Sequence, residues 1–191
     1  AHAPAQDRRA AVDVHLCGFL ELFARQPRFA LERVPSGRAQ RRGQRVVADD
    51  AAVRAMMKTI EATFGHLDAL INNAGIIQPF VMIKDLTVDA AAKVMNVNFH
   101  GPLMLTKAFL PGLLARPEAH ILNVSSMGAY APVPGQSVYG ASKAAIKLFT
   151  EGLRSELLTT KVGVTIVFPG AIATNIAANS GMAVPAAGSA E

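Results

Sequence analysis

Cysteine is almost missing from this chain, which has a single one, Cys17, among its 191 residues. An internal disulfide framework is therefore excluded, and a reducing compartment is favoured. Long hydrophobic runs are missing as well: the most apolar N-terminal segment, residues 12–24, contains Asp13 and Glu21 and lacks the layout of a signal peptide. Both absences predict a cytoplasmic protein without a membrane partner.

Lysine is missing from residues 1–45, which hold nine arginines against four acidic residues. This segment accounts for the whole net charge of +5, because the remaining residues balance ten basic against ten acidic side chains. Arginine-rich segments can bind nucleic acid, but this one lacks interleaved aromatic residues and a recognisable motif, so we expect no nucleic-acid partner.

The chain after residue 46 alternates short apolar runs with long amphipathic segments. Its length suits about one domain, and 51% apolar residues are enough for a core. We expect strands at 67–71, 120–124 and 163–168, and helices from Asp49 to about Phe64, from Thr87 to Pro111 and from 138 to about 160. This alternation is typical of an α/β fold, with a doubly wound parallel sheet and helices on both faces.

Polar, glycine-containing segments follow the three predicted strands. They read NNAG at 72–75, SSMG at 125–128 and PGAIAT at 169–174. In open parallel sheets, ligands bind beyond the carboxyl ends of the strands. The sequence therefore predicts a functional site at this edge.

Tyr139 and Lys143 lie four residues apart at the start of the third predicted helix, which places a phenol and an ammonium on one face. A free tyrosine has a pKa of about 10, and a neighbouring ammonium lowers it toward the range where general acid–base catalysis is efficient. A hydroxyl from the adjacent strand end, Ser125 or Ser126, could hold a substrate carbonyl. The competing interpretation is surface packing, which is the usual role of such a pair on an arbitrary helix.

Five motifs in order resemble the short-chain dehydrogenase/reductase family. They are NNAG at 72–75, NVNFHG at 96–101, NVSS at 123–126, YGASK at 139–143 and PGAIAT at 169–174. Each is weak alone, but the five together, spread over residues 47–180, form a specific signal. The resemblance implies a Rossmann-like fold and hydride exchange with a nicotinamide cofactor, NAD or NADP, during interconversion of a small-molecule alcohol and a carbonyl.

The resemblance also implies four catalytic residues. In the family the catalytic serine lies about thirteen positions before the tyrosine, which selects Ser126 over Ser125. Tyr139 corresponds to the general acid of reduction and base of oxidation, with Lys143 as its partner. Asn98 matches the asparagine that holds a water linking the lysine to solvent.

The remaining matches imply cofactor contacts and a homo-oligomer, such as a dimer. The residues expected to contact the cofactor are Asn73, Ala74, Gly75, Tyr139, Lys143, Pro169, Gly170, Ile172 and Thr174. No metal is expected, because His66 and His100 lack partners at metal-ligand spacing.

Residues 1–46 depart from the family, whose chains open with a strand and a glycine-rich turn, T-G-x-x-x-G-x-G, that binds the cofactor pyrophosphate. Gly37 and Gly43 have the outer spacing, but Arg41 occupies the middle position and Pro35 interrupts a preceding strand. A shifted reading frame and a genuine replacement segment both explain this. We expect this degenerate part to add at most a poorly packed edge, and the catalytic half, 47–191, to lack the family's last helix and strand.

The family motifs, together with the unusual residues 1–46, leave two possible functions. The first is the NAD(P)-dependent oxidoreductase described above, with weak dinucleotide binding because the phosphate-binding turn is missing. The alternative is a catalytically impaired Rossmann-like remnant that serves as an interaction or dimerisation module.

Overall fold

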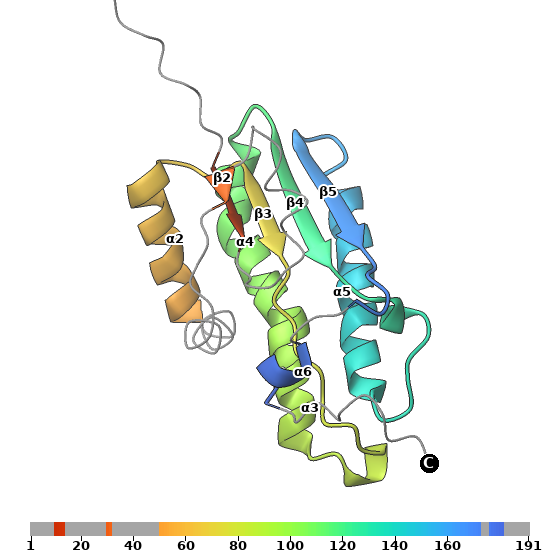
Figure 1. The fold of residues 1–191 in the computed structure, drawn as a ribbon. Helices are drawn as coiled ribbons and strands as arrows, with labels where there is room; N and C mark the ends of the chain where they lie inside the picture. Colours follow the sequence, from red (N-terminus) through yellow and green to blue (C-terminus); the bar gives the residue numbers. More distant parts are fainter. Residues whose placement is uncertain (1–9, 14–29, 32–49, 173–175, 182–191) are drawn as a thin grey trace, which may run out of the picture.

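The structure, a computed structural model, describes residues 10–13, 30–31, 50–172 and 176–181. Its centre is a parallel sheet of five strands in the order β2-β1-β3-β4-β5 (Figure 1). The strands are β1 (Ala10–Asp13), β2 (Ala30–Leu31), β3 (Ala69–Asn72), β4 (Ala119–Val124) and β5 (Val162–Val167). The predicted α/β class and the three apolar strands after residue 46 are confirmed.

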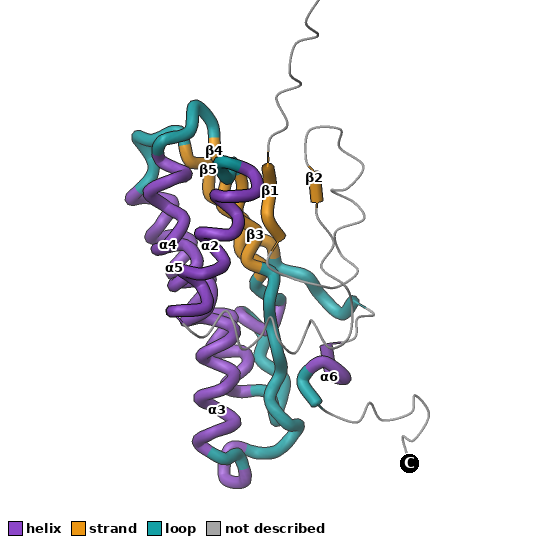
Figure 2. The backbone as a smooth tube through the Cα atoms, turned by 90° about the vertical axis from the view of Figure 1, so that its left-hand side faces the viewer, coloured by secondary structure: helices purple, strands orange, loops and turns teal. Residues whose placement is uncertain are grey.

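Three long helices form one layer against this sheet (Figure 2). They are α2 (Asp50–Phe64), α4 (Gly101–Leu114) and α5 (Ser137–Glu156). Apolar side chains of all three helices and of the strands share one core, in which Leu70, Leu113 and Ile121 are fully buried. Removing such side chains from water supplies most of the stabilisation of a fold of this kind.

Helices α2, α4 and α5 cover one face of the sheet (Figure 2). Along β4 the burial alternates, with Ala119, Ile121 and Asn123 buried and His120 exposed on the other face. Such alternation is the pattern of a strand with a single packed side. Among the described residues, the packed face of β4 is therefore the one that these three helices cover.

Strand β1 corrects the expectation that residues 1–45 contribute no more than an edge. Ala10–Asp13 lies inside the sheet, paired with β2 on one side and with β3 on the other. The strand is short and two of its four residues are alanine, which has low strand propensity. A search for apolar runs therefore does not find this strand, because its position in the sheet depends on pairing with β3.

The predicted helix from Thr87 to Pro111 is divided in three. Thr87 caps α3 (Val88–Met95) as expected, its hydroxyl accepting from the Ala90 N–H at 3.2 Å. A π-helical turn, η3 (Asn96–His100), follows, and α4 then continues through Pro111 to Leu114. Pro111 has no N–H, so it cannot donate to the carbonyl four residues earlier in the helix.

The carboxyl ends of β3 and β4 lie level, with Asn72 opposite Asn123. Asn72 Nδ2 donates to Asn123 Oδ1 at 2.8 Å and to Thr106 Oγ1 of α4 at 3.3 Å, and Asn123 Nδ2 donates to Thr150 Oγ1 of α5 at 2.8 Å. This buried polar chain joins both strands to both helices, so it fixes the floor beneath the strand ends. Among the described residues, no helix is long and apolar enough to cross a membrane.

Candidate active site

The segment that continues from β3 is extended, with alternate side chains buried. Asn72, Ala74, Ile76 and Gln78 point inward. Asn98, from the π-helical turn η3, holds the middle of this segment: its Oδ1 accepts from the Ile76 N–H, and its Nδ2 donates to the Ile76 carbonyl, both at 2.9 Å. The same Nδ2 donates to Ser142 Oγ of α5 at 2.9 Å. Asn98 therefore joins three elements at the strand ends.

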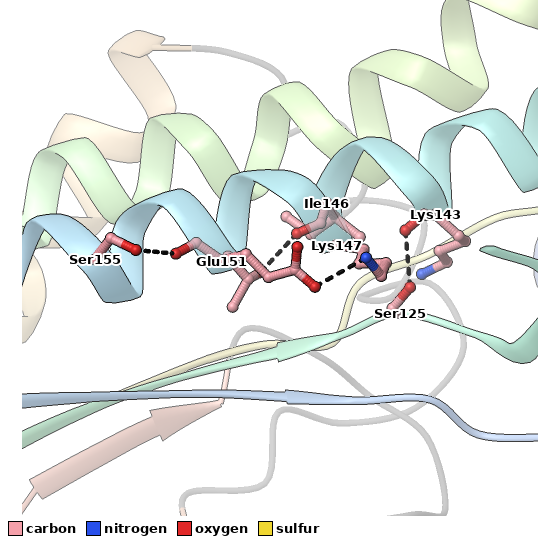
Figure 3. A network of polar contacts seen from close by, with 7 residues as sticks. Ser125, Lys143, Ile146, Lys147, Glu151 and Ser155 are labelled. Carbon is pink, nitrogen blue, oxygen red and sulfur yellow. Dashed lines mark hydrogen bonds and ion pairs between the residues drawn. The ribbon is translucent and has the colours of Figure 1, made fainter. Parts of the chain in front are cut away.

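The two serines after β4 have different partners. Ser125 is buried and its Oγ donates to the Lys143 carbonyl at 2.8 Å, which ties the strand end to α5 (Figure 3). Ser126 is half-buried, its Oγ accepts from the Gly128 N–H at 3.1 Å, and it hydrogen-bonds the phenol of Tyr139. The serine beside the phenol is thus Ser126, the one selected by the family spacing.

Tyr139 lies in the first turn of α5, with its ring against the apolar cluster of Ile76, Val94 and Val97. Burial raises the pKa of Tyr139 above its ordinary value of 10, and the hydrogen bond with Ser126 opposes that rise. The sequence predicted a lowered pKa of Tyr139, so the direction in this structure is opposite. Desolvation of the phenolate by the apolar cluster raises the pKa of Tyr139 more than the hydrogen bond with Ser126 lowers it.

Two glycines allow the phenol and the serine to approach. A Cβ on Gly128 would lie 3.3 Å from a ring carbon of Tyr139 and 3.5 Å from Ser126 Oγ. A Cβ on Gly140, the next residue of α5, would lie 2.9 Å from the Cβ of Pro132 and 3.0 Å from the Gly128 carbonyl. The helix and the loop after β4 can therefore pack this closely only because both positions lack side chains.

Lys143 is buried, with 3% of its surface exposed, and its Nζ donates to the Val124 carbonyl at 3.0 Å. Burial lowers the pKa of Lys143 from 10.5 to about 8, which leaves the amine largely protonated at neutral pH. The Nζ lies 5.9 Å from the centroid of the Tyr139 ring, over its face. The structure thus brings Ser126, Tyr139 and Lys143 together at the carboxyl end of β4.

Gly75 lies close to both the Lys143 amine and the Asn98 amide. A Cβ on Gly75 would lie 3.2 Å from Lys143 Nζ and 3.7 Å from Asn98 Oδ1. The amine and the amide oxygen therefore border the same point. A side chain at residue 75 would occupy it.

Replacing Lys143 by Met is expected to stabilise the fold at neutral pH. Below pH 8 both the folded and the unfolded chain hold the proton, so the folded state carries the full burial penalty of the ammonium. At ~1.4 kcal/mol per unit, a shift from 10.5 to about 8 corresponds to about 3 kcal/mol. Between these two values the unfolded chain binds more proton, so the stability of the unsubstituted protein rises with pH, and above 10.5 the penalty is gone.

Urea unfolding at neutral pH and above pH 10.5 measures this difference. The lost hydrogen bond to the Val124 carbonyl opposes the gain by about 1 kcal/mol. Lys147→Met is the matched control, because Lys147 lies one turn further along α5 and pairs with Glu151 at the surface (Figure 3). A Lys143→Met protein whose stability tracks that of the unsubstituted chain at both pH values would contradict the prediction.

The expected cofactor residues border the same edge of the sheet. Asn73, Ala74 and Gly75 follow β3 directly, and Ala74 is buried. Pro169, Gly170 and Ile172 follow β5, and the Pro169 carbonyl accepts from the Met127 N–H at 3.0 Å, which joins this loop to the one after β4. Ile172 is 47% exposed and a Cβ on Gly170 would meet no atom within 4 Å, so both face open space. Thr174 lies outside the described residues.

Lys143 provides the clearest fit to a polyhydroxylated ligand. An ammonium has three donors, and among the described residues only the Val124 carbonyl accepts from it. Two N–H groups of a buried amine are therefore left for other acceptors. The ribose hydroxyls expected from the family resemblance are acceptors of this kind.

Gln78 and Ser142 are site residues that the sequence did not indicate. Both are buried, Ser142 donates to the Tyr139 carbonyl at 2.7 Å, and Gln78 accepts from the Tyr139 N–H at 3.0 Å. Gln78 lies in no motif, and the YGASK motif that contains Ser142 gives that serine no role, since each residue acts through a contact that only the folded chain creates.

The described residues contain no group of three or more His, Cys, Asp or Glu side chains that could hold a metal ion. His66 lies 3.4 Å from Asp68, and His100 hydrogen-bonds Asn96 one turn earlier at 2.9 Å. Both histidines have local structural partners.

The family described as short chain dehydrogenase matches residues 36–184. The chain is 41% identical over 134 residues to dehydrogenase/reductase SDR family member 7B of Mus musculus, which covers 70% of this chain and 41% of that protein. The chain thus spans less than half the length of this relative.

Solved structures extend the likeness to the fold. A short chain dehydrogenase/reductase from Burkholderia phymatum in complex with NAD aligns with a TM-score of 0.68 at 26% identity, covering 90% of this chain and 58% of that one. The closed form of serine dehydrogenase complexed with NADP+ aligns with a TM-score of 0.67, also at 26% identity, covering 90% and 66%.

Proposed function

Because the chain belongs to the short-chain dehydrogenase/reductase family, we propose that it is an NAD(P)-dependent oxidoreductase that interconverts an alcohol and a carbonyl. The observation that carries this proposal is the hydrogen bond between Ser126 and the half-buried phenol of Tyr139, beside the buried amine of Lys143. Such a group can exchange a proton with a substrate oxygen.

In this proposal Tyr139 is the general acid and base, and Ser126 holds the substrate oxygen. In reduction, the phenol donates its proton to the carbonyl oxygen while the serine hydroxyl polarises it. In oxidation, the phenolate takes the proton from the alcohol. The cofactor, when bound, supplies or accepts the hydride.

The raised pKa of Tyr139 favours one direction. At neutral pH the phenol is protonated, so it is ready to act as an acid and poorly suited to act as a base. We therefore infer that carbonyl reduction is the faster direction near neutral pH.

Lys143 and Asn98 are proposed to return the proton to Tyr139 from solvent. Lys143 Nζ and Asn98 Oδ1 both lie beside Gly75, and a water bonded to both could link them.

The cofactor would lie along the same edge. Lys143 would donate to the ribose, and the segments of Asn73, Ala74 and Gly75 and of Pro169, Gly170, Ile172 and Thr174 would border the nicotinamide side. Complexes of two similar proteins, one with NAD and one with NADP+, support a nicotinamide cofactor without selecting between the two.

Transfer of deuterium tests the function directly. The chain is incubated with NADH or NADPH deuterated at the transferring carbon and with a panel of aldehydes and ketones, and the alcohols are analysed by mass spectrometry. Deuterium in the alcohol carbon supports the proposal even for slow turnover. Its absence from every product, with an unrelated dehydrogenase as positive control, would reject it.

The family resemblance also supports a homo-oligomer, and the single cysteine supports a cytoplasmic location. Light scattering on the purified chain measures the first, and fractionation of cells measures the second.

A further inference from the structure

Gln78 is a fully buried amide whose hydrogen-bonding groups all have partners in one place. Its Oε1 accepts from the Val138 N–H at 2.8 Å and from the Tyr139 N–H at 3.0 Å. Its Nε2 donates to the Gly135 carbonyl at 2.9 Å, and its own backbone carbonyl accepts from Gln136 Nε2 at 2.8 Å. Only 1% of its surface is exposed.

Through these bonds, a residue from outside the helix caps the N-terminus of α5. The first N–H groups of a helix have no partner within it, and the residue before the helix normally supplies an acceptor side chain. Here that residue, Gln136, makes no capping bond with its side chain. Gln78, which precedes Val138 and Tyr139 by 60 and 61 residues, supplies the acceptor instead.

We propose that Gln78 is a positioning residue that sets the location of the Tyr139 phenol by fixing the first turn of α5 to the segment after β3. The proposal rests on the function proposed for Tyr139. Its geometric basis is independent of that function, because the capped N–H belongs to Tyr139 itself. Asn98 makes a second link between the same segments through Ile76 and Ser142, one turn further along the helix.

An amide suits this position better than a carboxylate. Gln78 needs both an acceptor for two N–H groups and a donor for the Gly135 carbonyl, and only the amide offers both. A carboxylate would keep the acceptor but would place a negative charge beside Tyr139. The groups that already face Tyr139 are Lys143 on its own helix, Ser126 from the loop after β4, and apolar side chains of the segment after β3, of α3 and of η3.

The composition of the chain makes Tyr139 directly observable. The sequence has no tryptophan and two tyrosines, Tyr130 and Tyr139. In a Tyr130→Phe background, which keeps the ring that packs on Phe168, Tyr139 is the sole source of tyrosine signals. Near-ultraviolet circular dichroism then reports how well its ring is fixed, and the absorbance of the phenolate reports its pKa.

In this background we expect Gln78→Ala to lose most of the near-ultraviolet signal of Tyr139 while the far-ultraviolet spectrum is kept. Gln78→Glu should restore the signal, because the acceptor is kept, and should raise the pKa of Tyr139 by about 1 unit through charge repulsion. Thr160→Ala is the matched control: Thr160 Oγ1 also accepts a backbone N–H, that of Val162 at 3.1 Å, but beyond the far end of α5. It should change neither signal.

A Gln78→Ala protein with the same Tyr139 signal and pKa as Thr160→Ala would overturn the proposal. If both Gln78 variants fail to fold, hydrogen exchange on the unsubstituted chain decides: slow exchange of the Val138 and Tyr139 amides supports the cap, and exchange at the rate of free amides overturns it. None of these measurements requires turnover. Failure of the deuterium-transfer experiment would therefore reject the enzyme function and leave the positioning of Tyr139 to be judged separately.

Discussion

Tyr139→Phe is expected to lower the rate of hydride transfer by roughly 10²–10⁴-fold, the usual contribution of a positioned general acid. The substitution removes one oxygen atom and leaves the ring in the cluster of Ile76, Val94 and Val97. It also leaves Ser126 without its phenol partner. The substrate carbonyl would then receive its proton from water, without a group held in place to donate it.

The sequence supplies a matched control for this prediction. Tyr130→Phe makes the same chemical change at the only other tyrosine, whose ring packs on Phe168 with centroids 5.0 Å apart. We expect this variant to retain activity within a few-fold. Single-turnover transfer at high cofactor concentration is the measurement, because it does not require tight binding.

Equal losses in Tyr130→Phe and Tyr139→Phe would contradict the assignment of Tyr139 as the acid. A Tyr139→Phe protein with full activity would do the same. A lower rate of hydride transfer in Tyr139→Phe only, with unchanged cofactor affinity, would support a role of Tyr139 in proton donation alone.

The elements after residue 46 could be predicted because their signals are local. The runs around Leu70, Ile121 and Val164 are mostly apolar, as is typical of strands in a parallel sheet. Thr87 caps its helix by accepting a hydrogen bond from the N–H three residues later. Such features depend little on the rest of the chain. The same holds for the motif order that placed Ser126 and Tyr139 at one edge.

Features that depend on distant contacts could not be predicted. Strand β1 is recognisable only through its pairing with β3. The π-helical turn before Gly101 and Pro102 interrupts a sequence pattern that otherwise favours one continuous helix. Gln78 lies in no motif, because the N–H groups that it caps lie 60 and 61 residues further along the chain.

The pKa of Tyr139 shows the same limit in electrostatic terms. The spacing of Tyr139 and Lys143 predicted an ammonium that lowers the pKa of the phenol. The spacing does not reveal that the folded chain buries Lys143 and half-buries Tyr139, which raises the pKa of the phenol and lowers that of the amine. The sign of the shift is set by packing.

Weak cofactor binding is the second result with a large expected effect. The pyrophosphate carries most of the charge of a dinucleotide, and the family binds it with the backbone N–H groups of a glycine-rich turn at a helix N-terminus. Between β1 and Gly37 this sequence contains one glycine, Gly18. The place where the turn would be sought, after Asp13, lies outside the described residues.

The size of the effect follows from the bonds that would be missing. A hydrogen bond to a charged group contributes about 1.5–3 kcal/mol, so the loss of two weakens binding by about 3–6 kcal/mol, or roughly 10²–10⁴-fold. The contacts expected from Lys143 and from the segment after β5 act on the nicotinamide half only. They are too few to offset this loss.

Fluorescence titration of the 191-residue chain with NADH and with reduced nicotinamide mononucleotide separates the two halves of the cofactor. We expect both to bind weakly and with similar affinity, because the adenosine and its phosphate add little where the glycine turn is missing. Replacing residues 1–46 by a frame-corrected segment should strengthen NADH binding by the factor above and leave the mononucleotide nearly unchanged. Tight, saturable NADH binding by the present chain would contradict the prediction, and would mean that residues 1–46 hold the pyrophosphate without the family's glycines.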